Sequence, residues 1–263
     1  MLQGSLQGLQ VGSARLWLHG GVNVLVTGGT SGLGLAMAEA LAAAGSRVAL
    51  TGRSGERANS AAGRLSGAIG VELDVRDEVA VARAVDEVWS RLGGIDMLVN
   101  NAGIGMRSVN PRFLTHPQKF WEVPVEGFRD VVETNLVGYF LVAREVVPRM
   151  LARGGGRVVN VSVNESTMRR AGFVPYGPSR AGSEALSRVM AAELRDTGVT
   201  VNVLLPGGAT RTGMMPDDVP PGREVLDPSV MGPPIVWLAS DEAAGVHDER
   251  IVAVDFEQWR NAR

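Results

Sequence analysis

The chain lacks several residue types and patterns, and each absence narrows its possible functions. It contains no cysteine, which excludes disulfides, thiolate metal sites and cysteine nucleophiles and is consistent with a cytoplasmic location. Its three histidines are far apart and have no carboxylates at metal-ligand spacing, so the sequence predicts no metal site.

Charge and apolar runs give similar exclusions. The net charge is −2 with no basic block, which argues against nucleic acid or a membrane surface as a partner. No apolar stretch is long enough to span a bilayer. Residues 1–20 lack a basic leader followed by an apolar core, so we interpret them as an irregular N-terminal extension. Residues 21–263 are predicted to form a single domain, because no linker or repeat interrupts them.

Aromatic residues are also scarce, at 5%, whereas glycine, alanine and valine are abundant, which favours helices packed closely on a sheet. Apolar β-branched runs alternate with longer helical patterns. The runs predict strands at 22–29, 47–53, 68–75, 95–103, 156–163, 199–208 and 250–256, and helices at 33–45, 79–93, 125–151, 176–196 and 229–241. Continuously apolar strands alternating with helices predict an α/β fold, a single Rossmann-like doubly wound parallel sheet flanked by helices.

A glycine-rich turn, "TGGTSGLG" at 27–34, lies between the first predicted strand and the first predicted helix. Its glycines permit a tight turn and close backbone approach, and the helix start offers free N–H groups to a phosphate. Glycines also serve tight strand-to-helix packing, but this position in an α/β chain favours dinucleotide binding.

The spacing T-G-x-x-x-G-x-G, together with further motifs in order, resembles the classical short-chain dehydrogenase/reductase family. These motifs are "LDV" at 73–75, "NNAG" at 100–103, Asn135, Tyr176 and "PG" at 206–207, so the resemblance covers roughly residues 22–256. The resemblance implies that a nicotinamide dinucleotide contacts Gly28, Thr30, Ser31, Gly32, Leu33, Gly34, Asp74, Val75, Asn101, Ala102, Gly103, Tyr176, Arg180, Pro206, Gly207, and Thr210 or Thr212.

The end of the second predicted strand selects the coenzyme. A carboxylate there binds the adenosine ribose diol and repels a 2′-phosphate. This chain has Gly52 followed by Arg53, and a guanidinium suits a 2′-phosphate. The sequence therefore favours NADP(H), with NAD(H) as the alternative if Arg53 is only a solvated loop residue.

The candidate catalytic pair is Tyr176 and Arg180, which lie one helical turn apart. The resemblance implies that Tyr176 exchanges a proton with the substrate oxygen and that Asn135 supports proton supply. The family has lysine where this chain has Arg180. A free phenol titrates near ~10, so a nearby cation is needed to make it active, and arginine supplies a permanent charge. Ribose contact and proton relay by Arg180 remain open.

The family also has a serine thirteen residues before the tyrosine, which here is Val163. The adjacent Ser162 points to the opposite face of a regular strand, and it can serve only if a bulge or twist intervenes. A structural role for Ser162 is therefore favoured over a catalytic one, and Asn164, Ser166 or Thr167 are alternatives.

Two segments differ from the family in length. The stretch 103–127 is longer than usual and carries aromatic residues, which fits either an active-site loop or a surface or subunit-contact loop. The segment between the "PG" turn and residue 227 is short and proline-rich, so we expect a reduced substrate lid.

The leading hypothesis is an NADP(H)-dependent oxidoreductase that acts on a small-molecule carbonyl or secondary alcohol. The alternative is a catalytically weak or inactive dinucleotide-binding homologue, a sensor or assembly partner, because both the lysine and the aligned serine are replaced. The resemblance also implies a homo-oligomer, a dimer or tetramer, formed through the helices that carry Asn135 and Tyr176.

Overall fold

A computed structural model describes residues 21–216, 219, 222 and 224–263, so the interpretation of residues 1–20 and part of the predicted reduced lid lie outside it. The described chain forms a seven-stranded sheet in the order β3-β2-β1-β4-β5-β6-β7, with every neighbouring pair parallel. The strands are β1 (Asn23–Val26), β2 (Arg47–Gly52), β3 (Ile69–Glu72), β4 (Met97–Asn100), β5 (Gly156–Val161), β6 (Val199–Leu205) and β7 (Arg250–Val252). The predicted doubly wound parallel sheet is confirmed.

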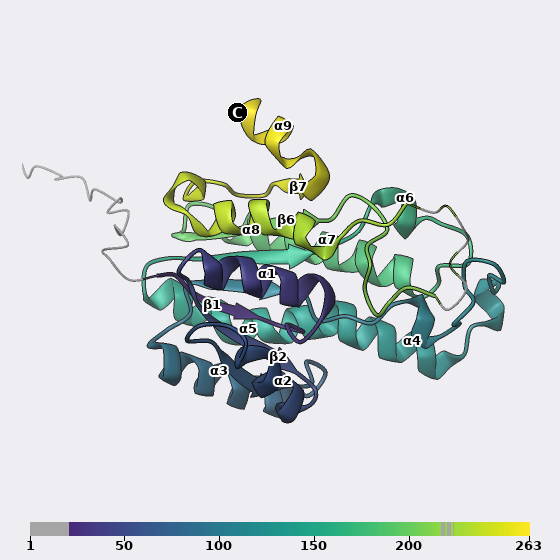
Figure 1. Cartoon of the computed structure of the whole chain (residues 1–263), viewed down its shortest axis with the longest axis horizontal. Helices are drawn as coiled ribbons and strands as arrows, with labels where there is room; N and C mark the ends of the chain where they lie inside the picture. Colours follow the sequence, from purple (N-terminus) through teal and green to yellow (C-terminus); the bar gives the residue numbers. More distant parts are fainter. Residues whose placement is uncertain (1–20, 217–218, 220–221, 223) are drawn as a thin grey trace, which may run out of the picture.

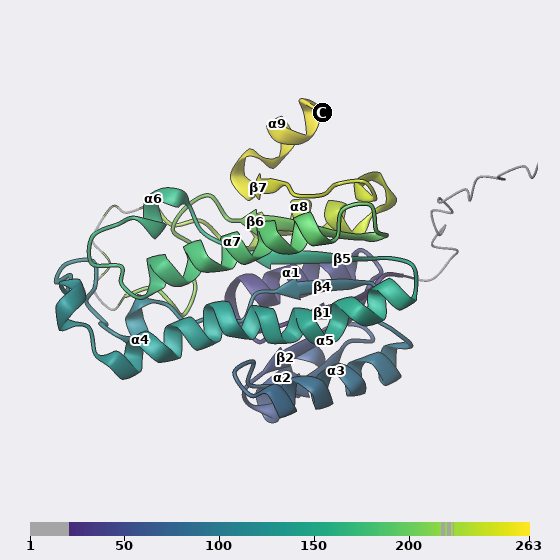
Figure 2. The same ribbon diagram turned by 180° about the vertical axis from the view of Figure 1, so that it is seen from behind.

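Helices cover both faces of the sheet (Figure 1). One face packs against α1 (Gly32–Ala43), α2 (Gly55–Ala62) and α8 (Gly232–Ala239), and the other against α3 (Glu78–Leu92), α5 (Gly138–Ala152) and α7 (Tyr176–Glu193). Figure 2 shows α5 and α7 together on the second face. The chain runs outward from β1 to β3 and then returns to β4, so the strand order reverses between β1 and β4. In open parallel sheets, ligands bind at the carboxyl ends of the strands at such a point.

The structure differs from the sequence prediction at α2, at the short helix α6 (Glu165–Met168) and at the end of β7. The short helix α2 was not predicted, because its eight residues begin with glycine and only its alanines are buried. The strand predicted at 250–256 was wrong beyond Val252, because the chain turns into helix α9 (Phe256–Asn261). Phe256 and Trp259, one turn apart, pack against Trp237, and this aromatic cluster favours helical spacing there.

The helix predicted at 125–151 is interrupted at the residue proposed for catalysis. It consists of α4 (Val125–Val132), a π-helical turn at Glu133–Val137, and then α5. Asn135 lies in the π turn and is fully buried. Such turns inside helices are frequently found at functional sites.

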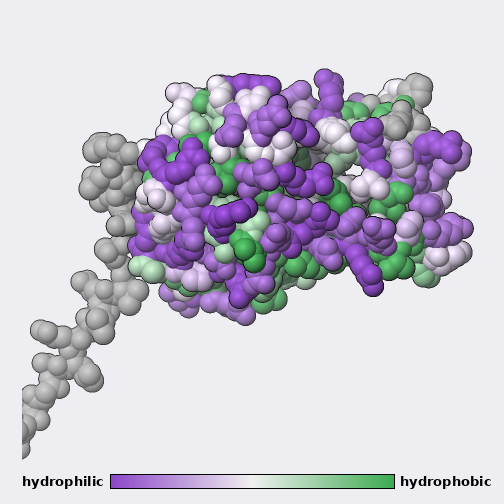
Figure 3. Space-filling model, turned by 90° about the horizontal axis from the view of Figure 1, so that it is seen from below, coloured by the Kyte–Doolittle hydropathy of each residue, from purple (hydrophilic) through white to green (hydrophobic). Residues whose placement is uncertain are grey.

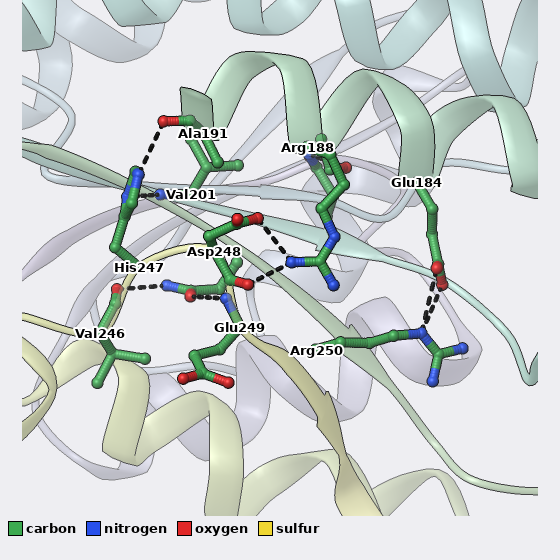
Figure 4. Close-up of polar contacts among 12 residues, drawn as sticks. Glu184, Arg188, Ala191, Val201, Val246, His247, Asp248, Glu249 and Arg250 are labelled. Atoms are coloured by element: carbon green, nitrogen blue, oxygen red, sulfur yellow. Dashed lines mark hydrogen bonds and ion pairs between the residues drawn. The ribbon is translucent and has the colours of Figure 1, made fainter. Parts of the chain in front are cut away.

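Polar contacts join the C-terminal half of α7 to β6 and to the segment that leads into β7 (Figure 4). His247 accepts a hydrogen bond from the Val201 N–H at 3.2 Å and contacts the Ala191 carbonyl at 2.8 Å. Two ion pairs also join α7 to this part of the chain. Arg188 pairs with Asp248, and Glu184 pairs with Arg250. These contacts fix the helix that carries Tyr176 against the sheet.

The surface viewed from below is mostly hydrophilic, with scattered hydrophobic groups (Figure 3). Of the helices that the structure describes, none is both long enough and apolar enough to cross a membrane. Likewise, no group of three or more metal-binding side chains occurs in the described part of the chain.

Candidate active site

The glycine-rich turn has the backbone that its sequence predicts. Gly28 and Gly32 have φ angles of 63° and 56°, in the region that favours glycine. A Cβ at position 28 would lie 2.7 Å from the Ala102 Cα, and one at position 34 would overlap the Gly28 carbonyl. Glycine is therefore required here for both backbone conformation and close packing.

The start of α1 is open to an anion. Ser31 is extended and makes no side-chain cap bond, and the first turn carries no acidic residue. The N–H groups of this turn and the helix dipole therefore remain available to a phosphate. Together with the bare glycine turn, this arrangement fits the diphosphate of a dinucleotide.

Asn101 joins the end of β4 to this turn. Its Nδ2 donates to the carbonyls of Thr27 and Gly28, both at 3.0 Å. The Thr27 hydroxyl accepts hydrogen bonds from the N–H groups of Asn101 and Ala102. The "NNAG" motif thus stabilises the backbone of the glycine-rich turn. The sequence motif alone did not indicate this structural role.

The Asn135 side chain is held by hydrogen bonds to two other segments. Its Oδ1 accepts from the Ile104 N–H at 2.9 Å, and its Nδ2 donates to the Ile104 carbonyl and the Ser179 hydroxyl, both at 3.0 Å. The side chain therefore links the π turn, the end of β4 and the start of α7.

The Arg180 guanidinium lies beside Tyr176, as their one-turn spacing predicts. The Cζ atom is 5.5 Å from the centre of the Tyr176 ring. Nη1 donates to the Tyr139 hydroxyl at 2.8 Å and to the Val161 carbonyl at 3.1 Å. The guanidinium is buried and its Nε has no hydrogen-bond partner. Burial acts to lower the pKa of Arg180, but the Tyr139 and Tyr176 hydroxyls outweigh it, so the net pKa is raised.

Gly103 leaves room for this charge. A Cβ at position 103 would overlap the Arg180 Nη2 atom and would lie 3.0 Å from the Asn135 Oδ1. The last residue of the "NNAG" motif therefore brings Arg180 and Asn135 together at the end of β4.

Ser162 lies on a regular continuation of β5. Its N–H donates to the Leu204 carbonyl at 2.9 Å, so the pairing with β6 is uninterrupted there. The hydroxyl is enclosed and has no hydrogen-bond partner. This geometry favours the structural role for Ser162. Among the alternatives, Asn164 is engaged with the Gly207 carbonyl at 2.8 Å.

The two candidate threonines have different surroundings. Thr210 is buried and donates to the Gly208 carbonyl at 3.2 Å. The side chain of Thr212 lies against Gly32, 3.2 Å from the place of a Cβ there. A groove of about 450 Å³ between this loop and α1 is lined by Gly32, Thr212 and neighbouring residues. Thr212 is thus the threonine beside the glycine-rich turn.

The residues predicted to contact the adenosine lie at and just after the ends of β2 and β3. Arg53 is exposed at the end of β2. Gly52 packs under Thr30, where a Cβ would lie 2.5 Å from the threonine methyl. Asp74 pairs with Arg76 at 2.7 Å, and this hydrogen bond lowers the pKa of Asp74. Arg76 lies directly after the "LDV" motif and outside it.

The long stretch 103–127 forms one wall of the site. Met106 and Phe113 are buried with Phe173, and the Tyr176 ring packs against this cluster. Phe113 meets Phe173 edge to face at 5.4 Å between ring centres. The same stretch exposes Phe120 and Trp121.

Tyr139 is the residue that sequence reasoning missed. It lies four residues after Asn135, and only two tyrosines occur in the chain. The spacing to Asn135 predicts a shared helix face, but nothing in it indicates contact with Arg180.

Comparisons with known proteins agree with this geometry. The short chain dehydrogenase family model matches residues 22–220. The 3-oxoacyl-(acyl-carrier-protein) reductase of Escherichia coli is 31% identical over 238 residues, 86% of this chain and 93% of the relative. A crystal structure of 3-ketoacyl-(acyl-carrier-protein) reductase from Brucella melitensis with NADH has a TM-score of 0.77 at 28% identity, covering 89% of this chain and 96% of that one. A variant of the actinorhodin polyketide ketoreductase with NADPH has a TM-score of 0.77 at 30% identity, covering 88% and 95%.

The chain belongs to the short-chain dehydrogenase family. It is an oxidoreductase of that family, and its relatives are named dehydrogenases or reductases.

Proposed function

We propose that the protein transfers hydride between NADP(H) and a carbonyl or secondary alcohol, with Tyr176 as the general acid or base. The observation that carries this proposal is the Arg180 guanidinium, buried 5.5 Å from the Tyr176 ring beside a fixed Asn135. When bound, the reduced coenzyme would supply the hydride to a carbonyl, and the oxidised coenzyme would accept it from an alcohol.

Tyr176 and Arg180 have different roles in proton transfer. A buried permanent cation stabilises the ionised form of a neighbouring phenol, so Tyr176 can take a proton from an alcohol or return one to a carbonyl oxygen. Arg180 does not exchange a proton itself, because a guanidinium stays charged. Asn135 acts by fixing the backbone of Ile104 beside the site.

The choice of NADP(H) rests on Gly52 and Arg53. An exposed guanidinium next to a residue without a carboxylate favours a 2′-phosphate. The solved relatives include one with NADH and one with NADPH, so the coenzyme must be measured on this chain. We expect Arg53→Ala to weaken NADPH binding roughly tenfold to a hundredfold and to leave NADH binding unchanged.

Fluorescence titration with each nucleotide measures this difference, and Arg64→Ala, an exposed arginine at the other end of α2, is the matched control. Equal losses for both nucleotides would contradict a role in binding the 2′-phosphate.

The substrate is proposed from the relatives and the wall of the site. Relatives are named as reductases of 3-oxoacyl groups on acyl carrier protein, and another as a polyketide ketoreductase. The apolar cluster of Met106, Phe113 and Phe173 beside Tyr176 suits the apolar part of such a substrate. A screen should therefore begin with short 3-oxoacyl thioesters and then extend to simple ketones.

The deciding experiment compares wild type with Tyr176→Phe in ketone reduction. We expect turnover to fall about 10²- to 10⁴-fold while NADPH affinity is kept, because only the proton-transfer group is lost. Thermal unfolding checks that the variant is folded. Unchanged turnover would refute the proposal.

The alternative of an inactive dinucleotide-binding homologue has no support from the comparisons. It predicts NADPH binding without turnover on any carbonyl tested, in wild type as in Tyr176→Phe. A homo-oligomer formed through α5 and α7, and a cytoplasmic location, stay proposals.

A further inference from the structure

Both tyrosines of the chain lie against one guanidinium. The Arg180 Cζ atom is 5.6 Å from the centre of the Tyr139 ring and 5.5 Å from that of Tyr176. Tyr139 comes from α5 and is 1% exposed, whereas Tyr176 begins α7 and is partly exposed. The same charge therefore meets one enclosed phenol and one that is partly exposed.

The enclosed phenol anchors one end of the guanidinium. The Tyr139 hydroxyl accepts from Arg180 Nη1 at 2.8 Å and donates to the Val161 carbonyl at 3.1 Å. Nη1 also donates to that carbonyl, so the three groups close a triangle on the end of β5. The other nitrogen, Nη2, lies against Gly103 at the end of β4. The anchor thus determines where the free end of the guanidinium points.

The charged groups around the Arg180 guanidinium include no carboxylate partner in the described part of the chain. Within the part of the chain that the structure describes, none of the ion pairs includes Arg180, and the titratable groups that act on it are Tyr139 from α5 and Tyr176 from α7. A buried cation without a carboxylate is costly unless hydrogen bonds or an ionisable neighbour compensate it. Burial raises the pKa of Tyr139, with Arg180 opposing, so Tyr139 serves as a neutral acceptor.

We propose that Tyr139 is a positioning residue that holds the Arg180 guanidinium on β5, so that its charge acts on Tyr176. The inference rests on the proposed role of Tyr176 as the proton-transfer group. Tyr139 itself does not touch the substrate, because its hydroxyl is enclosed between Arg180 and Val161.

The test is a double-mutant cycle read by ionisation of the tyrosine rings, which requires no substrate. Ring-labelled tyrosine gives two NMR signals, because the chain has two tyrosines, and Tyr139→Phe removes one of them. We expect Tyr139→Phe to move ionisation of the Tyr176 ring to higher pH by about one unit, since the charge is no longer held in place. In an Arg180→Met background the same substitution should cause no shift.

Two results would overturn the proposal. One is an equal shift in both backgrounds, which would mean that Tyr139 acts on the structure rather than through Arg180. The other is that Tyr139→Phe, made in the protein that keeps Arg180, causes no shift in the ionisation of the Tyr176 ring. Val79, 77% exposed on α3 and replaced by leucine, is the control and should leave the titration unchanged.

The wild-type protein gives a further check that needs no variant to fold. Tyr139 should ionise above the usual range of a tyrosine, because burial raises its pKa, and ionisation in the usual range contradicts its role as an enclosed, neutral acceptor. If Tyr176→Phe keeps full turnover, the proposed function fails, while the ring titration still decides whether Tyr139 and Arg180 are coupled. If the proposed function holds, the rate–pH profile of Tyr139→Phe should shift in the same direction as the ring signal.

Discussion

At the scale of single residues, a missing side chain shapes the site as much as the reactive groups do. Gly103 has no Cβ, and the space is occupied by the Arg180 Nη2 atom. Arginine is longer and broader than the lysine usual in the family, so it depends on this space. The site therefore accommodates Arg180 through a residue that has no chemistry of its own.

Gly103→Ala is expected to displace the guanidinium and to lower turnover about tenfold or more, because small misplacements of catalytic groups are costly. Steady-state kinetics on the best carbonyl substrate measures the loss. Gly245→Ala, at a position with nothing within 4 Å of an added Cβ, is the control. Equal activity of the two variants would show that Arg180 adapts freely.

At the scale of elements, α7 connects the chemistry at its first turn to a polar network at its far end. His247 bridges β6 and α7 through Val201 and Ala191, with Arg188 and Asp248 paired beside it (Figure 4). The tilt of α7 against the sheet therefore depends on contacts distant from Tyr176.

His247→Phe should lower the free energy of unfolding by about 1–3 kcal/mol, because two backbone groups lose their partner. Thermal or urea unfolding measures the change, and turnover below the transition should stay close to that of wild type. His116→Phe, on the exposed loop, is the control and should unfold like wild type. No difference between the two variants would mean that water replaces the His247 bonds at no cost.

At the scale of the whole molecule, α5 and α7 form an outer face of the sheet (Figure 2). Phe140 on α5 is 47% exposed and Val189 on α7 is 53% exposed. Apolar side chains on this face fit the homo-oligomer that family resemblance implies.

We expect wild type to sediment as a dimer or tetramer, and Phe140→Glu with Val189→Glu to shift it towards monomer, because charges would be buried in the interface. Analytical ultracentrifugation measures the mass. Val79→Glu, on α3 and 77% exposed, should leave it unchanged. A monomeric wild type would refute association through these helices.

The sequence by itself determined the architecture, because continuous apolar strands, helix periodicity and the glycine turn are local signals. It also determined that Tyr176 and Arg180 share a helix face, since their separation is one helical turn. The same local signals failed for α2 and for the end of β7. A short alanine-faced helix and an aromatic cluster gain stability from tertiary packing that no sequence window contains.

Only the tertiary structure decided how the site is assembled. The π turn at Asn135, the contact of Gly103 with Arg180 and the place of Thr212 beside Gly32 each join segments far apart in the chain. Tyr139 is the clearest case, because its hydroxyl meets Arg180 41 positions away in the sequence. Such contacts depend on which helices and strands pack together. Local sequence patterns identify the residues, but they do not indicate how distant segments pack.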